Sequence, residues 1–476
     1  MFPNLIDGRS IETADRFVDR NPSNLSDVVG EFARGTAADV DLAIAAARQA
    51  FAKWSLSTPQ TRFDVLDRAG TEILARKDEL GRLLSREQGK PLADGIGEAA
   101  RAGAIFKFFA GEALRVGGEK IASVRPDIDV EVTREPLGVV VAITPWNFPL
   151  AIPAWKIAPA LAFGNTVVFK PAELVPASPW SLVDIVQRAG LPPGVLNLVM
   201  GPGSKLGAAL ASSPDVDAIS FTGSQDVGPS VAAAAVKAGA RVQLEMGGKN
   251  PLIVLDDADL PTAVSVAVNG AYFQAGQRCT ASSRLIVTEG IHDRFVDAML
   301  ERMKRLVIDD ALKPGTEIGP VVDDRQLQKN LEYIEIGRRE GARLAWGGDR
   351  LTRDADGYYQ APAIFTDSTP AMRINSEEIF GPVAAVIRVR NYDEALAVAN
   401  GTPYGLSAGI VTTSLKHASH FKRHSSSGLV MVNLPTAGLD YHVPFGGRKK
   451  SSYGPREQGT YAKEFYTVVK TAYISA

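Results

Sequence analysis

The first quarter of the chain carries hydrophobic residues at helical spacing. Between residues 37 and 54, and again between 59 and 87, apolar positions three or four residues apart stand among Ala, Arg, Glu and Asp. A third stretch of this kind covers residues 92–114. This spacing gathers apolar side chains on one side of a helix, so each stretch is predicted to be an amphipathic helix. We interpret these helices as scaffold.

Strand patterns begin after this helical region. Residues 121–135 alternate polar and apolar positions, which predicts a β-hairpin that stands away from the body of the protein. From residue 138 onward, short runs of β-branched residues alternate with helical patterns. The expected strands are 138–144, 166–169, 195–199, 218–221 and 241–245, and the expected helices are 151–163, 179–189, 204–212 and 227–238. This alternation predicts a doubly wound parallel sheet, in which ligands bind outside the carboxyl ends of the strands.

A second alternating α/β region is predicted between residues 250 and 434. Its expected elements are strands at 252–255, 285–287, 384–388 and 410–412 and a helix at 291–305. The closing segment, 462–473, has a strand pattern but no neighbouring hairpin partner. We therefore expect it to add to a sheet in another subunit.

Composition and charge narrow the class of protein. A chain of 476 residues is too long for one compact core, so two or three domains are expected. It is 45% hydrophobic and 22% charged, as ordinary globular proteins are. Because 52 Lys and Arg stand against 54 Asp and Glu, the net charge is −2, and neither nucleic acid nor an anionic membrane is an expected partner. The expected ligands are small molecules.

Three further features bear on the cellular compartment. The single cysteine excludes an internal disulfide. Asp7, Arg9 and Glu12 stand where a signal sequence would have its apolar core. The most apolar region, 137–169, contains four prolines, which would interrupt a bilayer-spanning helix. We expect a cytoplasmic protein with no membrane partner.

A histidine cluster raises the question of a metal site. His417, His420 and His424 recur at the spacing of one helical face. They stand among lysine and arginine residues, and no cysteine or carboxylate pair completes a tetrahedral ligand set. We interpret this segment as a solvated helix and predict no metal.

The only cysteine, Cys279, is the candidate nucleophile. A lone cysteine in an intracellular protein is most often a small, inert core residue. The preceding Gly276 and Gln277, however, indicate a loop, where free backbone N–H groups suit acyl chemistry. Glu245 stands in an acidic turn thirty-four residues before Cys279, so a nucleophile and a carboxylate base could meet here.

Five motifs resemble the signatures of the aldehyde dehydrogenase superfamily and occur in that family's order. They are Thr-Pro-Trp-Asn-Phe-Pro (144–149), Phe-Thr-Gly-Ser (221–224), Glu-Met-Gly-Gly-Lys-Asn-Pro (245–251), Gly-Gln-Arg-Cys-Thr (276–280) and Glu-Glu-Ile-Phe-Gly-Pro (377–382). The similarity spans almost the whole chain. The resemblance implies an α/β fold of the aldehyde dehydrogenase type, with two doubly wound α/β domains plus a small β oligomerisation element.

The same resemblance implies the division of the chain. Residues 1–118 and 136–247 would form a dinucleotide-binding domain, and residues 248–445 a catalytic domain. The hairpin at 119–135 and the segment 446–476, which includes the C-terminal strand, would make subunit contacts. A homodimer or homotetramer is therefore expected.

The chemistry that the resemblance implies is aldehyde oxidation through a cysteine thioester. Cys279 is the implied nucleophile, and the side-chain amide of Asn147 with the backbone N–H of Cys279 would bind the oxyanion. Glu245 matches the base that activates water. From the residues alone, Asn147 is equally well a turn residue and Glu245 a charge at a strand end.

The implied cofactor is NAD. Lys170 and Glu173 match positions that hold the adenosine ribose, where a carboxylate accepts from the hydroxyls and repels a 2′-phosphate, so NAD is favoured while NADP stays open. Gly223 and Ser224 precede a helix, whose free N–H groups favour a pyrophosphate. The implied cofactor-binding residues are Thr144, Trp146, Lys170, Glu173, Gly223, Ser224, Glu378 and Phe380.

The implied small-molecule substrate is a semialdehyde. Residues 277–284, 331–338 and 438–452 are similar to the branch of the family that oxidises 2,5-dioxopentanoate to 2-oxoglutarate in sugar-acid catabolism. Succinate semialdehyde, or a broad range of aldehydes, is the alternative.

The way in which the substrate's carboxylate is bound needs a separate hypothesis. That branch tends to hold the carboxylate with two arginines, at positions that are Trp155 and Phe273 here. A carboxylate still needs a cationic partner, so Arg278 and His442 are the candidates.

Two other functional classes fit the sequence less well. A cysteine hydrolase or acyltransferase using Cys279 and Glu245 would leave the first α/β region unexplained. A binding protein on a retained enzyme fold would be free to lose Cys279, Glu245 or Asn147, and all three are present.

Overall fold

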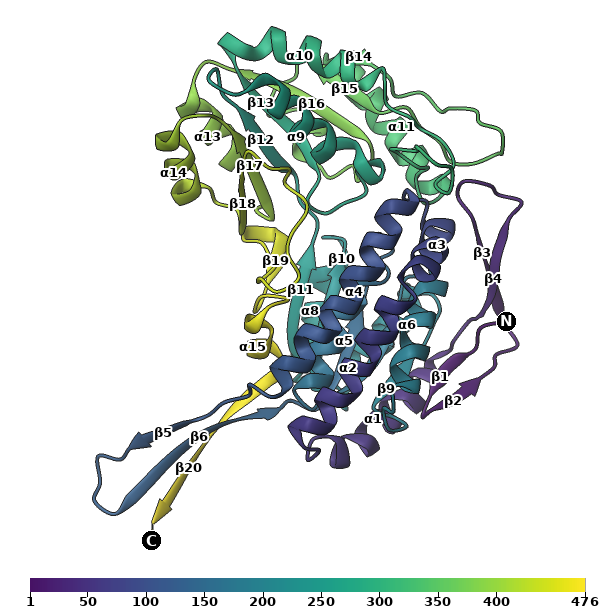
Figure 1. Ribbon diagram of the computed structural model, residues 1–476, viewed down its shortest axis with the longest axis vertical. Coiled ribbons are helices and arrows are strands. Elements are labelled where there is room, and N and C mark those ends of the chain that lie inside the picture. Colours follow the sequence, from purple (N-terminus) through teal and green to yellow (C-terminus); the bar gives the residue numbers. More distant parts are fainter. Residues whose placement is uncertain (476) are drawn as a thin grey trace.

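The computed structural model describes residues 1–475 and has two α/β lobes with a protruding β arm (Figure 1). The first lobe is built on an eight-stranded sheet and the second on a seven-stranded sheet. The arm is a three-stranded sheet that extends from the first lobe, next to the C-terminal end of the chain.

The first sheet is parallel at its centre. Its strand order is β19-β11-β10-β7-β8-β9-β1-β2, where β7 pairs in parallel with both β8 and β10. The strands are β1 (Asn4–Ile6), β2 (Arg9–Ile11), β7 (Val139–Ile143), β8 (Thr166–Lys170), β9 (Leu196–Leu198), β10 (Ala218–Gly223), β11 (Arg241–Met246) and β19 (Ser452–Tyr453). The expected strands all lie in this sheet, and β1, β2 and β19 are antiparallel additions that the sequence pattern missed.

Helices cover both faces of the first sheet, because its central strands are apolar on both sides. One face packs against α1 (Ala37–Trp54), α7 (Gly203–Ser212) and α8 (Gly228–Ala238). The other packs against α2 (Pro59–Ala75), α3 (Lys77–Gln88), α4 (Leu92–Ala113), α5 (Ala151–Ala162) and α6 (Ala177–Arg188).

The single helix predicted for residues 59–87 is wrong, because the structure has two helices there. Arg76 interrupts the helix with φ −102° and ψ 15°. Its guanidinium pairs with Glu72 at 3.0 Å on one side of the break and with Glu79 at 2.7 Å on the other. Polar residues with good helix propensity span the break, so the apolar pattern gave no sign of it.

The second sheet is also parallel except at one edge. Its order is β14-β15-β16-β13-β12-β17-β18, with β14 antiparallel to β15. The strands are β12 (Asn250–Val254), β13 (Ser282–Thr288), β14 (Arg343–Trp346), β15 (Ala363–Thr366), β16 (Val383–Val389), β17 (Ser407–Val411) and β18 (Leu429–Val432). The helices of this lobe are α9 (Leu260–Tyr272), α10 (Glu289–Met303), α11 (Asp324–Arg339), α12 (Arg373–Ser376), α13 (Tyr392–Asn400) and α14 (Leu415–His424).

The arm corrects the expectation for the C-terminal strand. The hairpin of β5 (Glu119–Ala122) and β6 (Ile128–Pro136) forms as predicted. The last strand, β20 (Thr467–Ser475), follows the short helix α15 (Lys463–Tyr466). Its pairing partner does not come from another subunit. The strand pairs antiparallel with β6 of its own chain along its whole length. More than 300 residues separate these strands, so the sequence has no local hairpin signal that predicts the pairing.

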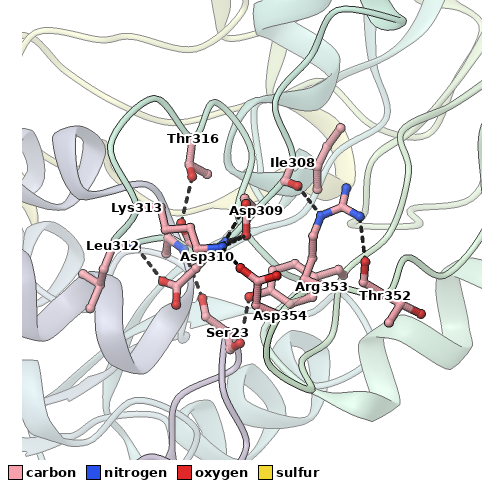
Figure 2. A network of polar contacts seen from close by, with 12 residues as sticks. Ser23, Ile308, Asp309, Asp310, Leu312, Lys313, Thr316, Thr352, Arg353 and Asp354 are labelled. Atoms are coloured by element: carbon pink, nitrogen blue, oxygen red, sulfur yellow. Dashed lines mark hydrogen bonds and ion pairs between the residues drawn. The ribbon is translucent and has the colours of Figure 1, made fainter.

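A loop of the second lobe anchors the N-terminal segment (Figure 2). The backbone N–H of Ala311 donates to Ser23 Oγ at 3.1 Å, and Tyr359 donates to the Ser23 carbonyl at 2.7 Å. Lys313 holds the loop by pairing with Asp309 and Asp354 at 3.0 and 2.7 Å. The Ala311 carbonyl also accepts from the N–H of Leu92, so the loop fixes the start of α4 as well. Ser23 itself lies between β3 (Arg16–Arg20) and β4 (Val28–Ala33).

Two features of residues 1–475 concern membranes and metal ions. No helix in this part of the chain is both long enough and apolar enough to cross a membrane. The same residues contain no group of three or more His, Cys, Asp or Glu side chains arranged to hold a metal ion.

A buried ion pair joins α4 to α5. Lys90 Nζ donates to Glu98 Oε2 at 2.6 Å and to the carbonyl of Asn147 at 2.8 Å. Glu98 Oε1 accepts from the backbone N–H groups of Leu150 and Ala151, at 2.9 and 3.1 Å, where α5 begins. Both charged side chains are almost inaccessible to water, so each depends on the other for compensation.

We expect Lys90→Met to lower the stability of the protein by about 3–5 kcal/mol, because it leaves the Glu98 carboxylate buried without its cation. The double variant Lys90→Met with Glu98→Gln should lose less, since no charge remains unpaired. Midpoints of urea unfolding for the wild type and both variants measure this difference. Equal midpoints for the single and the double variant would contradict the argument.

Candidate active site

Cys279 lies in a strained loop between α9 and β13. Residues 273–276 form the 3-10 turn η1 (Phe273–Gly276), in which Gln274 and Ala275 have φ of 57° and 54°. Such left-handed conformations cost about 1–3 kcal/mol for each residue with a side chain. At Gly276 a Cβ atom would lie 2.2 Å from the Gly381 carbonyl, so only glycine fits. The loop is therefore held in a shape that its residues do not prefer.

Asn250, at the start of β12, holds the backbone of the nucleophile. Its Nδ2 donates to the Cys279 carbonyl at 2.7 Å and to the Ala281 carbonyl at 3.0 Å. Its Oδ1 accepts from the N–H of Ser407 in the neighbouring strand β17. The position of Cys279 is thus tied directly to the second sheet.

Two cavities meet at Cys279. The narrow cavity has a volume of about 190 Å³, and the wide cavity about 500 Å³. Cys279, Trp155 and Phe445 line both. The rings of Trp155 and Phe445 stack with centroids 5.3 Å apart, so they form a shared wall. A thiol at this junction contacts molecules that occupy either cavity.

The narrow cavity brings together most of the residues expected to contact a cofactor. Trp146 and Phe380 meet edge to face, with ring centroids 5.3 Å apart. Phe380 has φ +64°, a strained conformation that fixes the direction of its ring. The predicted residues that line this cavity are Trp146, Asn147, Trp155, Gly223, Ser224, Glu245, Cys279, Glu378 and Phe380.

Glu378 reaches this cavity because a glycine makes room for it. Its carboxylate accepts from the N–H of Gly248 at 2.8 Å. A Cβ atom at Gly247 would lie 2.1 Å from the same carboxylate. Burial raises the pKa of Glu378 above its usual value. The turn that follows Glu245 therefore sets the position of Glu378.

Three other cofactor candidates lie outside the lining of the narrow cavity. Thr144 and Lys170 lie together at the carboxyl ends of β7 and β8, where the Thr144 N–H donates to the Lys170 carbonyl. Lys170 Nζ donates to the Pro171 carbonyl at 2.7 Å, and burial lowers the pKa of Lys170 to about 8. Glu173 is half-buried, with its carboxylate 3.9 Å from the Arg34 guanidinium. These three residues lie along the first sheet, away from the thiol.

Glu245 has the environment of a general base. Ser452 Oγ donates to Glu245 Oε2 at 2.5 Å, while Oε1 is buried without a partner in the described part of the chain. Burial raises the pKa of Glu245 to about 8. A carboxylate whose pKa is close to neutral pH both accepts and releases a proton readily.

A buried polar network lies behind Glu245. Lys156 on α5 pairs with Glu457 and donates to Ser220 Oγ at 2.7 Å. Ser220 in turn donates to Gln243 at 3.0 Å. The charges of this pair act on the pKa of Glu245 in opposite directions: Glu457 raises it and Lys156 lowers it. The network therefore tunes the base electrostatically.

The environment of Cys279 disfavours its thiolate form. Burial, with smaller contributions from Glu378 and Glu245, raises the pKa of Cys279 to about 12. Asn147, the expected oxyanion donor, is buried beside the same loop, and its amide donates to the Gln277 carbonyl at 3.1 Å. Its catalytic role stays a prediction.

Of the four residues expected to bind the substrate, two line the wide cavity and two line neither cavity. Trp155 and Arg278 line the wide cavity. Arg278 is buried, its Nη2 donates to the carbonyls of Asn269 and Gly270, and burial lowers the pKa of its guanidinium to about 10. Phe273 packs against the core of the second lobe and His442 is exposed, and neither lines either cavity.

Sequence reasoning missed one face of α4. Residues of this helix that line the wide cavity are Ala93, Asp94, Gly97, Glu98 and Arg101. Asp94, Glu98 and Arg101 recur at helical spacing within a segment that we interpreted as scaffold. The signal available in the sequence was a set of two acidic residues and one arginine on one face of a largely apolar helix. Asn250 and Ser452 gave no comparable signal, because their partners are distant in sequence.

Comparisons with known proteins agree with these motifs. The family model described as the aldehyde dehydrogenase family matches residues 10–472. An alpha-ketoglutaric semialdehyde dehydrogenase of Bacillus subtilis (strain 168) is 44% identical over 99% of this chain and 97% of its own length. An alpha-ketoglutarate semialdehyde dehydrogenase of Haloferax volcanii is 45% identical over 98% of this chain and 96% of its own. A 2,5-dioxopentanoate dehydrogenase of Saccharolobus solfataricus is 41% identical over 97% and 96%.

Solved structures agree as well. A betaine aldehyde dehydrogenase of Staphylococcus aureus, solved in complex with NAD+, superimposes with a TM-score of 0.97 at 36% identity, covering 99% of this chain and 94% of that one. This similarity confirms the predicted fold class, and the family model spans nearly the whole length. The chain belongs to the aldehyde dehydrogenase family and is therefore an oxidoreductase.

Proposed function

We propose that this protein oxidises 2,5-dioxopentanoate to 2-oxoglutarate with NAD, through a thioester on Cys279. The observation that carries the proposal is that two cavities meet at the thiol of Cys279. Glu245, a carboxylate with a raised pKa, lines one of these cavities. The substrate is supported by three relatives, 41–45% identical over nearly full length, that are named for this semialdehyde. Succinate semialdehyde is the alternative substrate.

The narrow cavity fits the reactive end of a dinucleotide. Gly223 leaves space that a side chain would fill, because a Cβ there would lie 2.4 Å from the Phe221 ring. Trp146 and Phe380 provide aromatic surfaces for a flat ring, and Glu378 a carboxylate for ribose hydroxyls. Lys170 and Glu173 would hold the adenosine ribose at the carboxyl ends of the first sheet. These residues would hold NAD, which would supply the acceptor for the hydride.

The chemistry assigned to the protein's own residues has two stages. Cys279 Sγ forms a bond to the aldehyde carbon as the thiol proton passes to solvent water, and the amide of Asn147 with the Cys279 N–H stabilises the oxyanion. Loss of hydride from that carbon leaves a thioester. Glu245 then accepts a proton from water, whose oxygen adds to the thioester carbon. The carbon–sulfur bond breaks and releases the carboxylate, and the proton held by Glu245 passes to the sulfur, which restores both the thiol and the base.

The remaining assignments also form part of the proposal. The division into a dinucleotide-binding domain (1–118 and 136–247), a catalytic domain (248–445) and an oligomerisation element (119–135 and 446–476) is supported by the two sheets and the arm. A homodimer or homotetramer is supported by the exposed apolar side chains of β20, Val469, Tyr473 and Ile474. A cytoplasmic setting is supported by a reactive thiol that must stay reduced.

Glu245→Gln should complete hydride transfer but fail in hydrolysis. We expect a burst of about one NADH per active site and then a stall, because the amide cannot accept a proton from water. Cys279→Ala, the control, should give neither burst nor turnover. Full steady turnover without a burst in Glu245→Gln would remove this residue from the role of base.

The pH profile of the wild type tests the same carboxylate. Because the pKa of Glu245 is raised to about 8, its carboxyl group is largely protonated below that pH and cannot act as a base. We expect the hydrolytic step to accelerate as pH rises through about 8 and to level off above. Rapid-quench measurement of thioester decay gives this rate directly, and a rate that falls over this range would contradict the assignment.

Glu173→Ser should weaken the preference for NAD over NADP. Removing the carboxylate takes away a ribose contact and the repulsion of a 2′-phosphate, so we expect the ratio of specificity constants to narrow on the order of tenfold, or 1.4 kcal/mol. Steady-state kinetics with NAD and with NADP measure this ratio in the wild type and the variant. A wild type that prefers NADP would contradict the role of Glu173.

A panel of aldehydes tests the substrate. We expect a higher kcat/KM for 2,5-dioxopentanoate than for succinate semialdehyde, pentanal or betaine aldehyde, each measured with NAD. A tenfold preference for succinate semialdehyde or for an aldehyde without a carboxylate would overturn the assignment.

A further inference from the structure

The wide cavity is lined by four ionisable side chains besides the thiol: Asp94, Glu98, Arg101 and Arg278. Glu98 is neutralised by Lys90, and its two oxygens already accept hydrogen bonds from Lys90 and from the start of α5. The Glu98 carboxylate therefore has little capacity left to compensate the positive charge of an arginine on the same helix. The charge of the cavity is decided by the remaining three.

Arg278 is held by the protein through one of its nitrogens, while its Nε is buried without a partner in the described residues. Its Nη2 donates to two backbone carbonyls at the end of α9, those of Asn269 and Gly270. The charge of Asp94, which faces the same cavity, favours its protonated state. A guanidinium held in this way is fixed in orientation and has fewer donors free for a ligand.

In the described residues neither Arg278 nor Arg101 has an ion pair within 4 Å, but Arg101 is held by fewer hydrogen bonds. One long hydrogen bond of 3.4 Å joins its Nη2 to Gln458 Oε1, and its Nε is buried without a partner. Glu98 and Asp440 favour its protonated state, but neither lies close enough for an ion pair. Burial lowers the pKa of Arg101, which reports the cost of removing this cation from water without a matched anion.

We propose that Arg101 is a specificity-determining residue that binds the substrate's carboxylate in the wide cavity. A guanidinium with free donors matches the two oxygens of a carboxylate in a fork. The substrate is a linear chain with its aldehyde at one end and its carboxylate at the other, and the same cavity is lined by Cys279 and Arg101. This inference rests on the proposed function, because it names the residue that selects a carboxylated aldehyde.

The assignment differs from that expected from the sequence. His442 is exposed and outside the lining of the cavity, while Arg278 donates to the protein's own carbonyls. Both guanidinium groups have a buried Nε without a partner in the described residues, but Arg278 Nη2 donates to two backbone carbonyls, whereas Arg101 Nη2 makes one long hydrogen bond. We therefore assign the main carboxylate contact to Arg101 on α4, with Arg278 beside the nucleophile in a lesser role.

The test compares charged and uncharged ligands in the variant Arg101→Met, which keeps the length of the side chain and removes its charge. We expect the KM for 2,5-dioxopentanoate to rise at least about tenfold, equivalent to 1.4 kcal/mol, with kcat within about twofold. Kinetics with pentanal should be unchanged. Competitive inhibition by glutarate, measured against pentanal, should weaken by a similar factor.

Two further variants make the result specific. Arg82→Met removes an exposed arginine from the neighbouring helix α3 and should change nothing. Arg101→Lys keeps the charge but loses the fork, so its KM should lie between those of the wild type and Arg101→Met. Arg278→Met should affect glutarate inhibition less than Arg101→Met does.

The outcomes separate this inference from the proposed function. If glutarate inhibits Arg101→Met as strongly as it inhibits the wild type, or if pentanal oxidation falls equally, Arg101 is not the carboxylate contact. If the wild type prefers pentanal in the aldehyde panel, the proposed substrate fails. Even then, loss of glutarate inhibition in Arg101→Met alone would establish Arg101 as a binding group for carboxylates.

Discussion

The ion pair between Lys90 and Glu98 determines the geometry around the reactive thiol. The ammonium group binds the carbonyl of Asn147, and the carboxylate binds the first N–H groups of α5. Through these contacts one pair fixes the turn that carries the candidate oxyanion donor and the helix that carries Trp155 and Lys156. It also orients the face of α4 that lines the wide cavity. In a low-dielectric interior such a pair is specific in geometry, because neither charge has an alternative partner.

The sequence predicted the parallel core of both lobes well, since buried parallel strands and amphipathic helices leave strong local patterns. It failed where local propensity was not decisive. The break at Arg76 lies among polar helix formers, and β20 pairs with a strand more than 300 residues away. The antiparallel additions β1, β2 and β19 are only two or three residues long, too short for periodicity to detect.

For the candidate site, the motifs brought the right loops together, and the structure explains why these residues suit the chemistry. Glu245 is predictable as a residue but not as a base with a raised pKa, because the shift comes from burial and is only partly opposed by the hydrogen bond from Ser452, about two hundred residues later in the chain. The positions expected to be arginine carry Trp155 and Phe273, and the guanidinium that is held by a single long hydrogen bond lies on α4. The cation that we propose for the substrate's carboxylate thus lies on α4 and not at the positions expected from the motifs, so motif matching alone does not reveal it.

The wall shared by Trp155 and Phe445 links the two cavities mechanically. Each ring lines both spaces, and the two rings stack with centroids 5.3 Å apart. Trimming either ring to admit a bulkier aldehyde would also enlarge the chamber on the other side. Altering the range of aldehydes through this wall therefore perturbs the neighbouring compartment, whereas changes on the α4 face leave the wall intact. Natural or laboratory diversification of this scaffold has the greater freedom on the helix.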